Sequence, residues 1–198
     1  FLNLRTIKYL IAGIDEVGKG CLFGPVFAGA VILSKENELK LQSKGLKDSK
    51  KLNPQQRKSL IPLIKENSIG WALGQASARE IDSMGIRKAT EKAMMRAIEK
   101  LSISPDLILV DGILPLRSWE GKQQTQVRGE SHFPCIAAAS VLAKEARDQL
   151  IMRLASTYNL YALEKNKGYG TKIHRTNLIK AGPTRLHRKS FLSKLKIN

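Results

Sequence analysis

Three short apolar segments of this chain each run into acidic residues, and this feature constrains the fold more than any other. Asp15 and Glu16 end the segment YLIAGIDEV, Asp111 ends LILVDG, and Glu130 follows QVRG. Buried carboxylates are costly unless protons or cations neutralise them. We therefore expect three strands that finish at one edge of a sheet and bring these carboxylates together.

A cluster of hard oxygen ligands suits Mg²⁺ or Mn²⁺. Two such ions about 4 Å apart can hold a scissile phosphate between them. Neighbouring residues of a strand point to opposite faces, so we expect Asp15 and Glu16 to share a site through a bend that Gly18 and Gly20 permit. An exposed Asp-Glu turn is the alternative on this segment alone, and the acids that end the other two segments favour the metal site.

The segment GIDEVGKGCLFGPV has the spacing of a phosphate-binding P-loop as far as Lys19. Gly20 then stands where a P-loop needs the Ser or Thr hydroxyl that binds Mg²⁺. Asp15 and Glu16 would lie inside the cradle and repel phosphate, and CLFGP cannot open the helix that follows a P-loop. We therefore reject a P-loop and expect no saturable binding of ATP or GTP.

The remaining pattern predicts an α/β fold with a mixed sheet. YLIAGIDEV and VFAGAVIL predict a hairpin with a tight glycine-bearing turn, and IGWALGQAS, DLILVDG and QTQVRGE predict three further strands, the last at an edge. NPQQRKSLIPLIKEN predicts a helix capped by Asn53 and kinked or shortened at Pro62. Residues 78–101 predict a long helix broken at Gly85, and residues 134–158 predict another.

The charge balance indicates the partner. The chain has 34 Lys and Arg against 17 Asp and Glu, a formal net charge of +17. Such an excess attracts polyanions, of which nucleic acid is the commonest. The alternative is a protein whose surface is simply cationic.

Cysteine content and hydropathy indicate the compartment. Cys21 and Cys135 are too few for a zinc site and lie in apolar sequence, so we expect buried free thiols in a reducing compartment. The apolar run near the start is too short for a signal peptide, and no segment approaches a membrane span. We expect a cytoplasmic protein, monomeric and without membrane contact.

Five motifs together carry a resemblance to a known family. In order along nearly the whole chain they are GIDEVGKGCLFGPV, LKDSKKL, LILVDG, GESHFPCIAAASVLAKEARD and GYGTKIH…GPTRLHRKSF. The chain resembles bacterial ribonuclease HII, of the type 2 ribonuclease H family. The resemblance implies a ribonuclease H-like fold, with a catalytic core over residues 1–157. It also implies that residues 158–198 form a basic helical extension that completes the substrate groove.

The same resemblance implies an activity. The family cleaves the RNA strand of RNA/DNA hybrids with Mg²⁺ or Mn²⁺, two ions with substrate bound, and leaves 5′-phosphate and 3′-hydroxyl ends. It also incises duplex DNA at single embedded ribonucleotides. The alternatives are a ribonuclease HIII-like hybrid nuclease without that junction preference and, in a different class, a non-catalytic basic nucleic-acid-binding module.

Carried over by position, the resemblance assigns the metal-binding and catalytic acids. Asp15, Glu16 and Asp111 match the family's acids. Glu130 matches the fourth, which is usually Asp, and is one methylene longer. Asp148 in KEARD is the competing candidate, and we interpret it as a salt-bridging residue on its predicted helix.

The resemblance also predicts substrate contacts. The family's Gly-Arg-Gly loop, which contacts the nucleotide at the RNA–DNA junction, is Gly18-Lys19-Gly20 here and, with LFGP, is closer to ribonuclease HIII. Tyr169 in GYGT matches the tyrosine that stacks on the sugar beyond the junction. The residues that we expect to meet backbone phosphates are Lys47, Ser49, Lys50, Lys51, Arg188 and Lys189.

The three histidines are scattered along the sequence. We interpret His132 as a helix-start residue, and His174 and His187 as tail contacts or surface residues. Ser140 lies in an alanine-rich packing face, so no nucleophilic triad is predicted.

Overall fold

The computed structural model describes residues 9–193. The strands are β1 (Ile11–Val17), β2 (Val26–Ile32), β3 (Gly70–Ala76), β4 (Leu107–Asp111) and β5 (Gln123–Gln126). The α-helices are α1 (Lys35–Ser43), α2 (Pro54–Asn67), α3 (Ala78–Glu99), α4 (Pro134–Ala155), α5 (Leu163–Asn166), α6 (Lys172–Ala181) and α7 (Lys189–Leu192). Short 3₁₀ helices are η1 (Ser49–Lys51), η2 (Gly129–Ser131) and η3 (Asn159–Tyr161).

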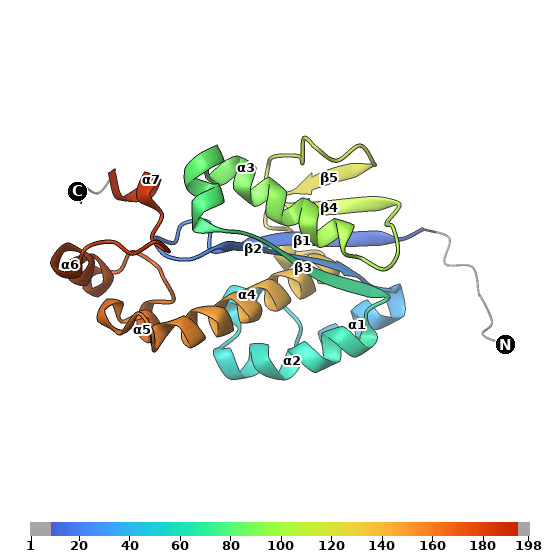
Figure 1. Cartoon of the computed structure of the whole chain (residues 1–198). Helices are drawn as coiled ribbons and strands as arrows, with labels where there is room; N and C mark the ends of the chain where they lie inside the picture. The colour runs from blue at the N-terminus through green and yellow to red at the C-terminus, as the bar shows by residue number, and fades with distance from the viewer. Residues whose placement is uncertain (1–8, 194–198) are drawn as a thin grey trace.

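The strands form one mixed sheet in the order β3-β2-β1-β4-β5. β1, β2 and β3 are an antiparallel meander, whereas β4 and β5 run parallel to β1. Helix α3 covers one face of the sheet, and α1, α2 and α4 cover the other (Figure 1). The predicted α/β class and the edge position of the QTQVRGE strand are confirmed.

Helix α4 lies very close to the sheet because glycines face it. A Cβ added at Gly13 of β1 would stand 2.3 Å from the backbone of Cys135, and one at Gly29 of β2 would stand 2.4 Å from the carbonyl oxygen of Ala139. Protein interiors have no room for such an overlap. The glycines and the small residues of α4 therefore set the helix against the strands that carry the acids.

The connection between β1 and β2 differs from the expected tight turn. The two strands do pair antiparallel, with Val17 opposite Phe27, but residues 18–25 lie between them as a loop. This loop, which we call the glycine loop, pairs with the C-terminal part of the chain through the isolated bridges Cys21↔Tyr169 and Phe23↔His187. Because its backbone groups find partners there, the loop need not close tightly on itself.

Two helix expectations concern internal breaks. Helix α2 continues through Pro62 to Asn67, so Pro62 does not shorten it, and a kink at Pro62 stays a prediction. Pro62 is exposed, and water can satisfy the carbonyl that the ring leaves without a partner. The break in α3 at Gly85 is confirmed, since Gly85 has φ +81° and ψ +155° inside the helix.

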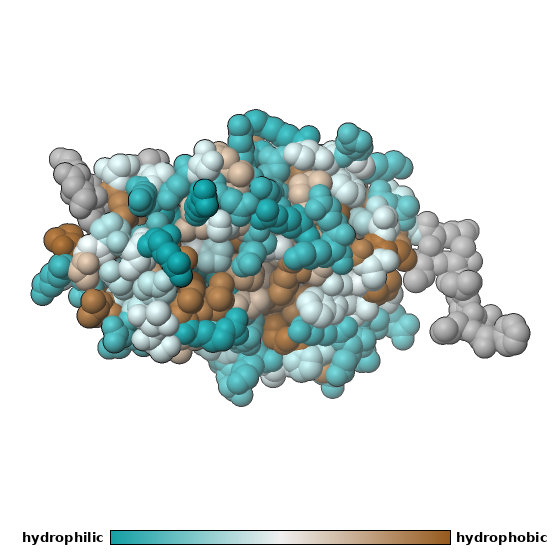
Figure 2. All heavy atoms as spheres, in the orientation of Figure 1, coloured by the Kyte–Doolittle hydropathy of each residue, from teal (hydrophilic) through white to brown (hydrophobic). Residues whose placement is uncertain are grey.

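The residues after α4 have a hydrophobic cluster of their own, which includes the glycine loop. Its buried members are Leu22, Phe23, Ile151, Tyr161, Leu163, Leu178 and Leu192. Hydrophilic residues cover most of the face seen in Figure 2, with smaller separate hydrophobic areas. Within residues 9–193, no helix combines the length and the hydropathy that a bilayer crossing requires. Cys21 and Cys135 are buried and free, as expected.

Candidate active site

The register of the parallel strands brings Asp15 and Asp111 together. The β1–β4 ladder ends at Ile14↔Val110, so the next residue of each strand is an aspartate. Gly13 and Leu109, each two residues before one of these aspartates, face α4. Because alternate residues of a strand share a face, the side chains of Asp15 and Asp111 also lie on the α4 face. Asp15 is only 5% exposed. This register is the reason why the two acids meet at one edge of the sheet, as expected.

Glu16 and Glu130 approach the same edge by other routes. Glu16 lies inside β1, on the opposite face from Asp15, and its own N–H donates to Asp15 Oδ1 at 2.7 Å. The expected bend at Gly18 and Gly20 is therefore not what joins the pair. Glu130 does not end a strand either. It belongs to η2, which begins at Gly129, after β5 has ended at Gln126.

Helix η2 is tied to Asp111 and to α4. The N–H of Gly129 donates to Asp111 Oδ1 at 2.7 Å. The Oε2 of Glu130 lies 3.0 Å from the hydroxyl of Ser140 on α4 and 3.2 Å from that of Ser49 on η1. Glu130 is thus held from two sides as a buried carboxylate.

Burial and mutual repulsion make this an unusual set of acids. Burial, and then the charge of Glu16, raises the pKa of Asp15 well above its usual value, and the charges of Asp111 and Glu130 add to the effect. Burial also raises the pKa of Asp111, against the stabilising hydrogen bond from Gly129. Carboxylates that repel one another in a desolvated place gain most from a bound cation.

Lysines supply positive charge at this edge. The ammonium of Lys19 lies 2.9 Å from Glu16 Oε1, and that of Lys50 is hydrogen-bonded to Glu130. The hydrogen bond to Glu130 raises the pKa of Lys50. In this arrangement no three acidic, His or Cys side chains of residues 9–193 converge closely enough to enclose a metal ion. Both lysines are exposed, so they can move away when another cation or a phosphate enters.

A pocket of about 280 Å³ opens above these acids. It brings together most of the residues that sequence reasoning assigned to the site. Its lining includes Asp15, Glu16, Asp111, Gly18, Lys19, Gly20, Ser49, Lys50 and Tyr169. The lining also holds Arg57, Ser140 and Lys144, which the sequence analysis did not assign to it.

The other expected contact residues divide into exposed and buried ones. Lys47, Lys51 and Lys189 are exposed on the surface. Arg188 is fully buried and donates to the carbonyl oxygens of Gly24 and Lys19, so the expectation that it meets phosphates is wrong. Ser49 lines the pocket, and its hydroxyl is hydrogen-bonded to Glu130, so its expected contact with phosphate stays a prediction.

Asp148 is separated from the cluster by its own basic partners. Lys144 lies 2.9 Å from its Oδ1, one helical turn away, and Arg57 of α2 lies 3.9 Å from its Oδ2. Arg57 also donates to the carbonyl of Leu52, just after η1. The interpretation of Asp148 as a salt-bridging residue therefore agrees with the structure, although Arg57 could not be identified as a partner from spacing.

Two side chains that hold the site residues in place were missed because their sequence setting is typical of packing residues. Ser140 stands in the alanine run of α4, yet its hydroxyl lies 3.0 Å from Glu130 Oε2. Arg147 is fully buried and donates to three carbonyl oxygens, those of Phe23, Pro25 and Lys167. A single polar residue in an otherwise apolar helical face was the available signal for Ser140.

The two glycines of the pocket differ sharply in what they tolerate. Gly18 has φ +85°, and a Cβ there would stand 2.2 Å from Nε of Arg147, whereas nothing lies within 4 Å of a Cβ at Gly20. We expect Gly18→Ala to lower the free energy of unfolding by about 2–3 kcal/mol and Gly20→Ala to change it by less than about 0.5 kcal/mol. Urea unfolding of both variants measures this, and equal losses would contradict the geometry.

His174 and His187 are not surface residues. They are 0% and 1% exposed, in the cluster that joins the glycine loop to the C-terminal helices. Burial lowers the pKa of His174, and it lowers that of His187 to about 4. His132 is exposed and lies just before α4, as expected of a residue near a helix start.

This burial predicts an acid-dependent loss of stability. Below pH 6.5 the unfolded chain binds a proton at His187 that the folded protein does not, so stability present above pH 6.5 falls until the pH reaches about 4. The contribution is on the order of 3 kcal/mol. Thermal unfolding of wild type and His187→Gln between pH 7 and 4.5 measures it. We expect the two stability curves to converge toward acid, and parallel curves would refute the prediction.

Comparisons with known proteins decide the family. A family model described as Ribonuclease HII matches residues 12–194. The chain belongs to the ribonuclease HII family. It is 75% identical over 195 residues to a ribonuclease HII of Prochlorococcus marinus strain NATL1A, covering 98% of this chain and 100% of that one. The chain is therefore an endoribonuclease with ribonuclease H activity on RNA/DNA hybrids. The alternative of a non-catalytic nucleic-acid-binding module is excluded.

Solved structures share the fold at lower identity. Ribonuclease H2 of Pyrococcus horikoshii OT3 superposes with a TM-score of 0.80 at 24% identity, covering 95% of this chain and 96% of that one. Bst ribonuclease HIII in complex with Mn²⁺ gives a TM-score of 0.71 at 20% identity, covering 93% of this chain and 64% of that one. Both confirm the ribonuclease H-like fold expected for this ribonuclease HII chain.

Proposed function

We propose that this enzyme cleaves the RNA strand of hybrids, and incises duplex DNA at single embedded ribonucleotides, by hydrolysis assisted by two divalent ions. The observation that carries the proposal is the meeting of Asp15, Glu16 and Asp111 in one pocket beneath a lysine-bearing rim. The net charge of +17 attracts a polyanion to the protein, and the carboxylate cluster lies at the pocket that the polyanion would reach. That combination suits phosphodiester chemistry, with 5′-phosphate and 3′-hydroxyl products.

The donor set suits Mg²⁺ or Mn²⁺. Asp15, Glu16, Asp111 and Glu130 offer only hard oxygen ligands. Burial first, and then repulsion between the acids, raises the pKa values of Asp15 and Asp111, and a divalent ion would offset both effects. The chemistry that such ions supply is activation of water and neutralisation of charge at the leaving oxygen. The Mn²⁺ complex of Bst ribonuclease HIII supports divalent metal use in this fold.

The chain's own residues prepare this site in two ways. Ser49 and Ser140 hold Glu130 toward the cluster, which compensates for a side chain one methylene longer than the usual Asp. Lys50 neutralises Glu130, and Lys19 neutralises Glu16, until ions and substrate arrive. Side chains already fixed by hydrogen bonds lose little entropy when ligands bind.

Substrate contacts follow from exposure around the pocket. The exposed lysines 47, 50, 51 and 189 suit backbone phosphates, which position a duplex without reading its sequence. Gly18, Lys19 and Gly20 offer close backbone approach to the junction nucleotide. Tyr169 is 38% exposed and lies at the pocket, where its ring can pack on a sugar that lacks the 2′-hydroxyl. Residues 158–198 would then complete the groove of a core formed by residues 1–157.

Lys19 is the reason to keep the alternative of a ribonuclease HIII-like preference. Its ammonium carries charge but lacks the planar fork of the family's arginine, and here it is paired with Glu16. A general hybrid nuclease without junction preference would result if that fork is what recognises the junction. We expect junction incision to persist, because the glycine backbone on both sides of Lys19 is retained.

Cleavage-site mapping tests the proposal. Labelled duplexes carrying one ribonucleotide in DNA, or a complete RNA strand paired with DNA, are incubated with enzyme in Mg²⁺ or Mn²⁺. We expect cutting of both, with a single incision at the embedded ribonucleotide. Cutting of the hybrid alone would support the HIII-like alternative, and no cutting by folded enzyme with either ion would overturn the whole proposal.

Gly20→Ala supplies a matched variant for the glycine loop. Because a Cβ at Gly20 meets nothing in the protein, we expect a loss of cleavage to report contact with substrate.

We also propose that the protein is a monomer and works in the reducing cytoplasm, which suits its free thiols.

A further inference from the structure

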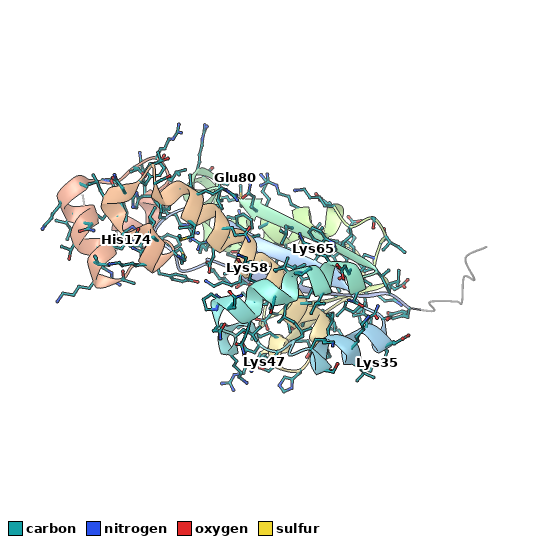
Figure 3. The ribbon with its side chains drawn as sticks, turned by 90° about the horizontal axis from the view of Figure 1, so that it is seen from below. Lys35, Lys47, Lys58, Lys65, Glu80 and His174 are labelled. Carbon is teal, nitrogen blue, oxygen red and sulfur yellow. The ribbon has the colours of Figure 1, made fainter. Side chains whose placement is uncertain are left out.

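A buried pair of histidines stands behind the tyrosine of the pocket. His174 of α6 and His187, between α6 and α7, have their Nε2 atoms 3.2 Å apart. The Nδ1 of His174 lies 2.9 Å from the carbonyl oxygen of Tyr169. Figure 3 shows His174 among the C-terminal helices, and its exposed fraction is 0%. Neither imidazole reaches the acids, so the pair has no direct part in hydrolysis.

Backbone groups at both ends of the pair fix its tautomers. A carbonyl oxygen can only accept, so Nδ1 of His174 carries a hydrogen and its Nε2 is an acceptor. The N–H of Thr184 donates to Nδ1 of His187 at 3.0 Å, so the hydrogen of His187 is on Nε2. His187 therefore donates to His174, which donates to Tyr169. This is one continuous chain of hydrogen bonds between two neutral rings.

The same pair is joined to the glycine loop. His187 forms the bridge with Phe23, and their ring centroids lie 5.0 Å apart. The N–H groups of Arg188 and Gly24 complete this junction, donating at 2.8 Å to the carbonyls of Leu22 and Leu186 respectively. One side of the pair therefore fixes Tyr169, and the other side fixes the loop that faces it.

The ring of Tyr169 has few constraints of its own. It is 38% exposed, the cationic groups of Lys144 and Arg147 lie 5.7 and 5.9 Å from its centroid, and its hydroxyl interacts with the side chain of Cys21. Its place is set by its backbone, which the bridge to Cys21 and the hydrogen bond from His174 hold. A stacking side chain must be held in position before binding if it is to discriminate between sugars.

We propose that His174 and His187 are positioning residues, whose hydrogen-bond chain fixes Tyr169 against the glycine loop for sugar recognition. This inference rests on the proposed contact of Tyr169 with substrate. It assigns to the two histidines a role in substrate discrimination, in addition to their share in the packing of the C-terminal helices.

Two substitutions at His174 separate this role from packing. An Asn amide stands near the Nδ1 position and can still donate to the Tyr169 carbonyl, whereas a Gln amide stands near Nε2 and cannot. We expect His174→Gln to lower kcat/KM on single-ribonucleotide duplexes about fivefold, the cost of one hydrogen bond, and His174→Asn to stay within about twofold of wild type. Leu178→Ala, a buried change in the same helix that removes no hydrogen bond, is the stability control.

A double-mutant cycle with Tyr169→Ala gives the decisive readout. We expect the loss caused by His174→Gln to disappear in the Tyr169→Ala background. An equal loss in both backgrounds, or equal activity of the Asn and Gln variants, would overturn the positioning role while leaving the function of Tyr169 intact. If Tyr169→Ala itself cleaves like wild type, the proposed contact of Tyr169 fails and this inference fails with it.

Imidazole ¹⁵N NMR tests the chain of hydrogen bonds without activity. We expect His174 in the Nδ1–H tautomer and His187 in the Nε2–H tautomer at neutral pH. Any other assignment of the two rings would contradict the proposed connection to Tyr169.

Discussion

We expect Asp15→Asn to lower the rate of RNA cleavage by about a thousandfold or more and to unfold at a higher temperature than the wild type. Activity is lost because the amide removes one anionic ligand from the centre of the cluster. Stability rises because the pKa of buried Asp15 is raised, so the ionised side chain opposes folding at neutral pH, and the neutral amide does not. Single-turnover cleavage and thermal unfolding at pH 7.5 measure the two effects.

Asp111→Asn should behave in the same way, and Asp148→Asn is the matched control. Asp148 is a buried carboxylate of the same size as Asp15, but it is paired with Lys144 and Arg57. Asp148→Asn should lower the free energy of unfolding and leave the rate of the chemical step close to that of the wild type. Glu130→Gln should lower the rate of that step strongly. Near-normal cleavage by Asp15→Asn, or a larger loss in Asp148→Asn than in Glu130→Gln, would show that the assigned acids are wrong.

Removing the guanidinium of Arg147 is expected to have the largest effect on stability. Arg147→Met leaves three carbonyl oxygens, a buried one on Phe23 and partly buried ones on Pro25 and Lys167, without the donors that they have in the wild type. We expect the free energy of unfolding to fall by about 3–5 kcal/mol. Denaturant unfolding measures this loss against Arg153→Met, a change of the same type at an exposed position of the same helix.

The Arg147 variant should also lose activity, since the guanidinium fills the space behind Gly18 and joins the glycine loop to the segment before Tyr169. Cleavage assayed at a temperature where the variant stays folded separates this effect from unfolding. A loss of stability no larger than that of Arg153→Met would refute the importance of these hydrogen bonds.

Sequence reasoning predicted the strands, and the place of Asp15 and Asp111 on them, because local pattern decides both, whereas Glu130 lies on η2 and not at a strand end. Apolar runs that end in carboxylates have few other solutions than a common sheet edge. The pattern could not give the register, however, and the register explains the site: β1 and β4 stop pairing one residue before Asp15 and Asp111. Asp15 and Glu16 are consecutive residues of β1 on opposite faces of the strand, and both line the pocket without the expected bend at Gly18 and Gly20.

The basic tail was harder to interpret from sequence. Arg188 and Lys189 are neighbours with the same charge, yet Arg188 is buried against the glycine loop and Lys189 is exposed. Burial there depends on pairing between residues 164 and 169 positions apart in the chain, which no local pattern encodes. The same long-range pairing buries His174 and His187. Their scattered spacing allowed either tail contacts or surface residues, and the structure shows buried contacts within the C-terminal part.

Binding of Mn²⁺ tests the central claim most directly, because it requires no assumption about substrate. Isothermal titration of the full chain is compared with the Asp15→Asn/Asp111→Asn double variant and with Asp148→Asn, each shown to be folded. We predict saturable Mn²⁺ binding by wild type and by Asp148→Asn, and none by the double variant. A double variant that binds Mn²⁺ as tightly as wild type would contradict the assignment of this carboxylate cluster as the metal site.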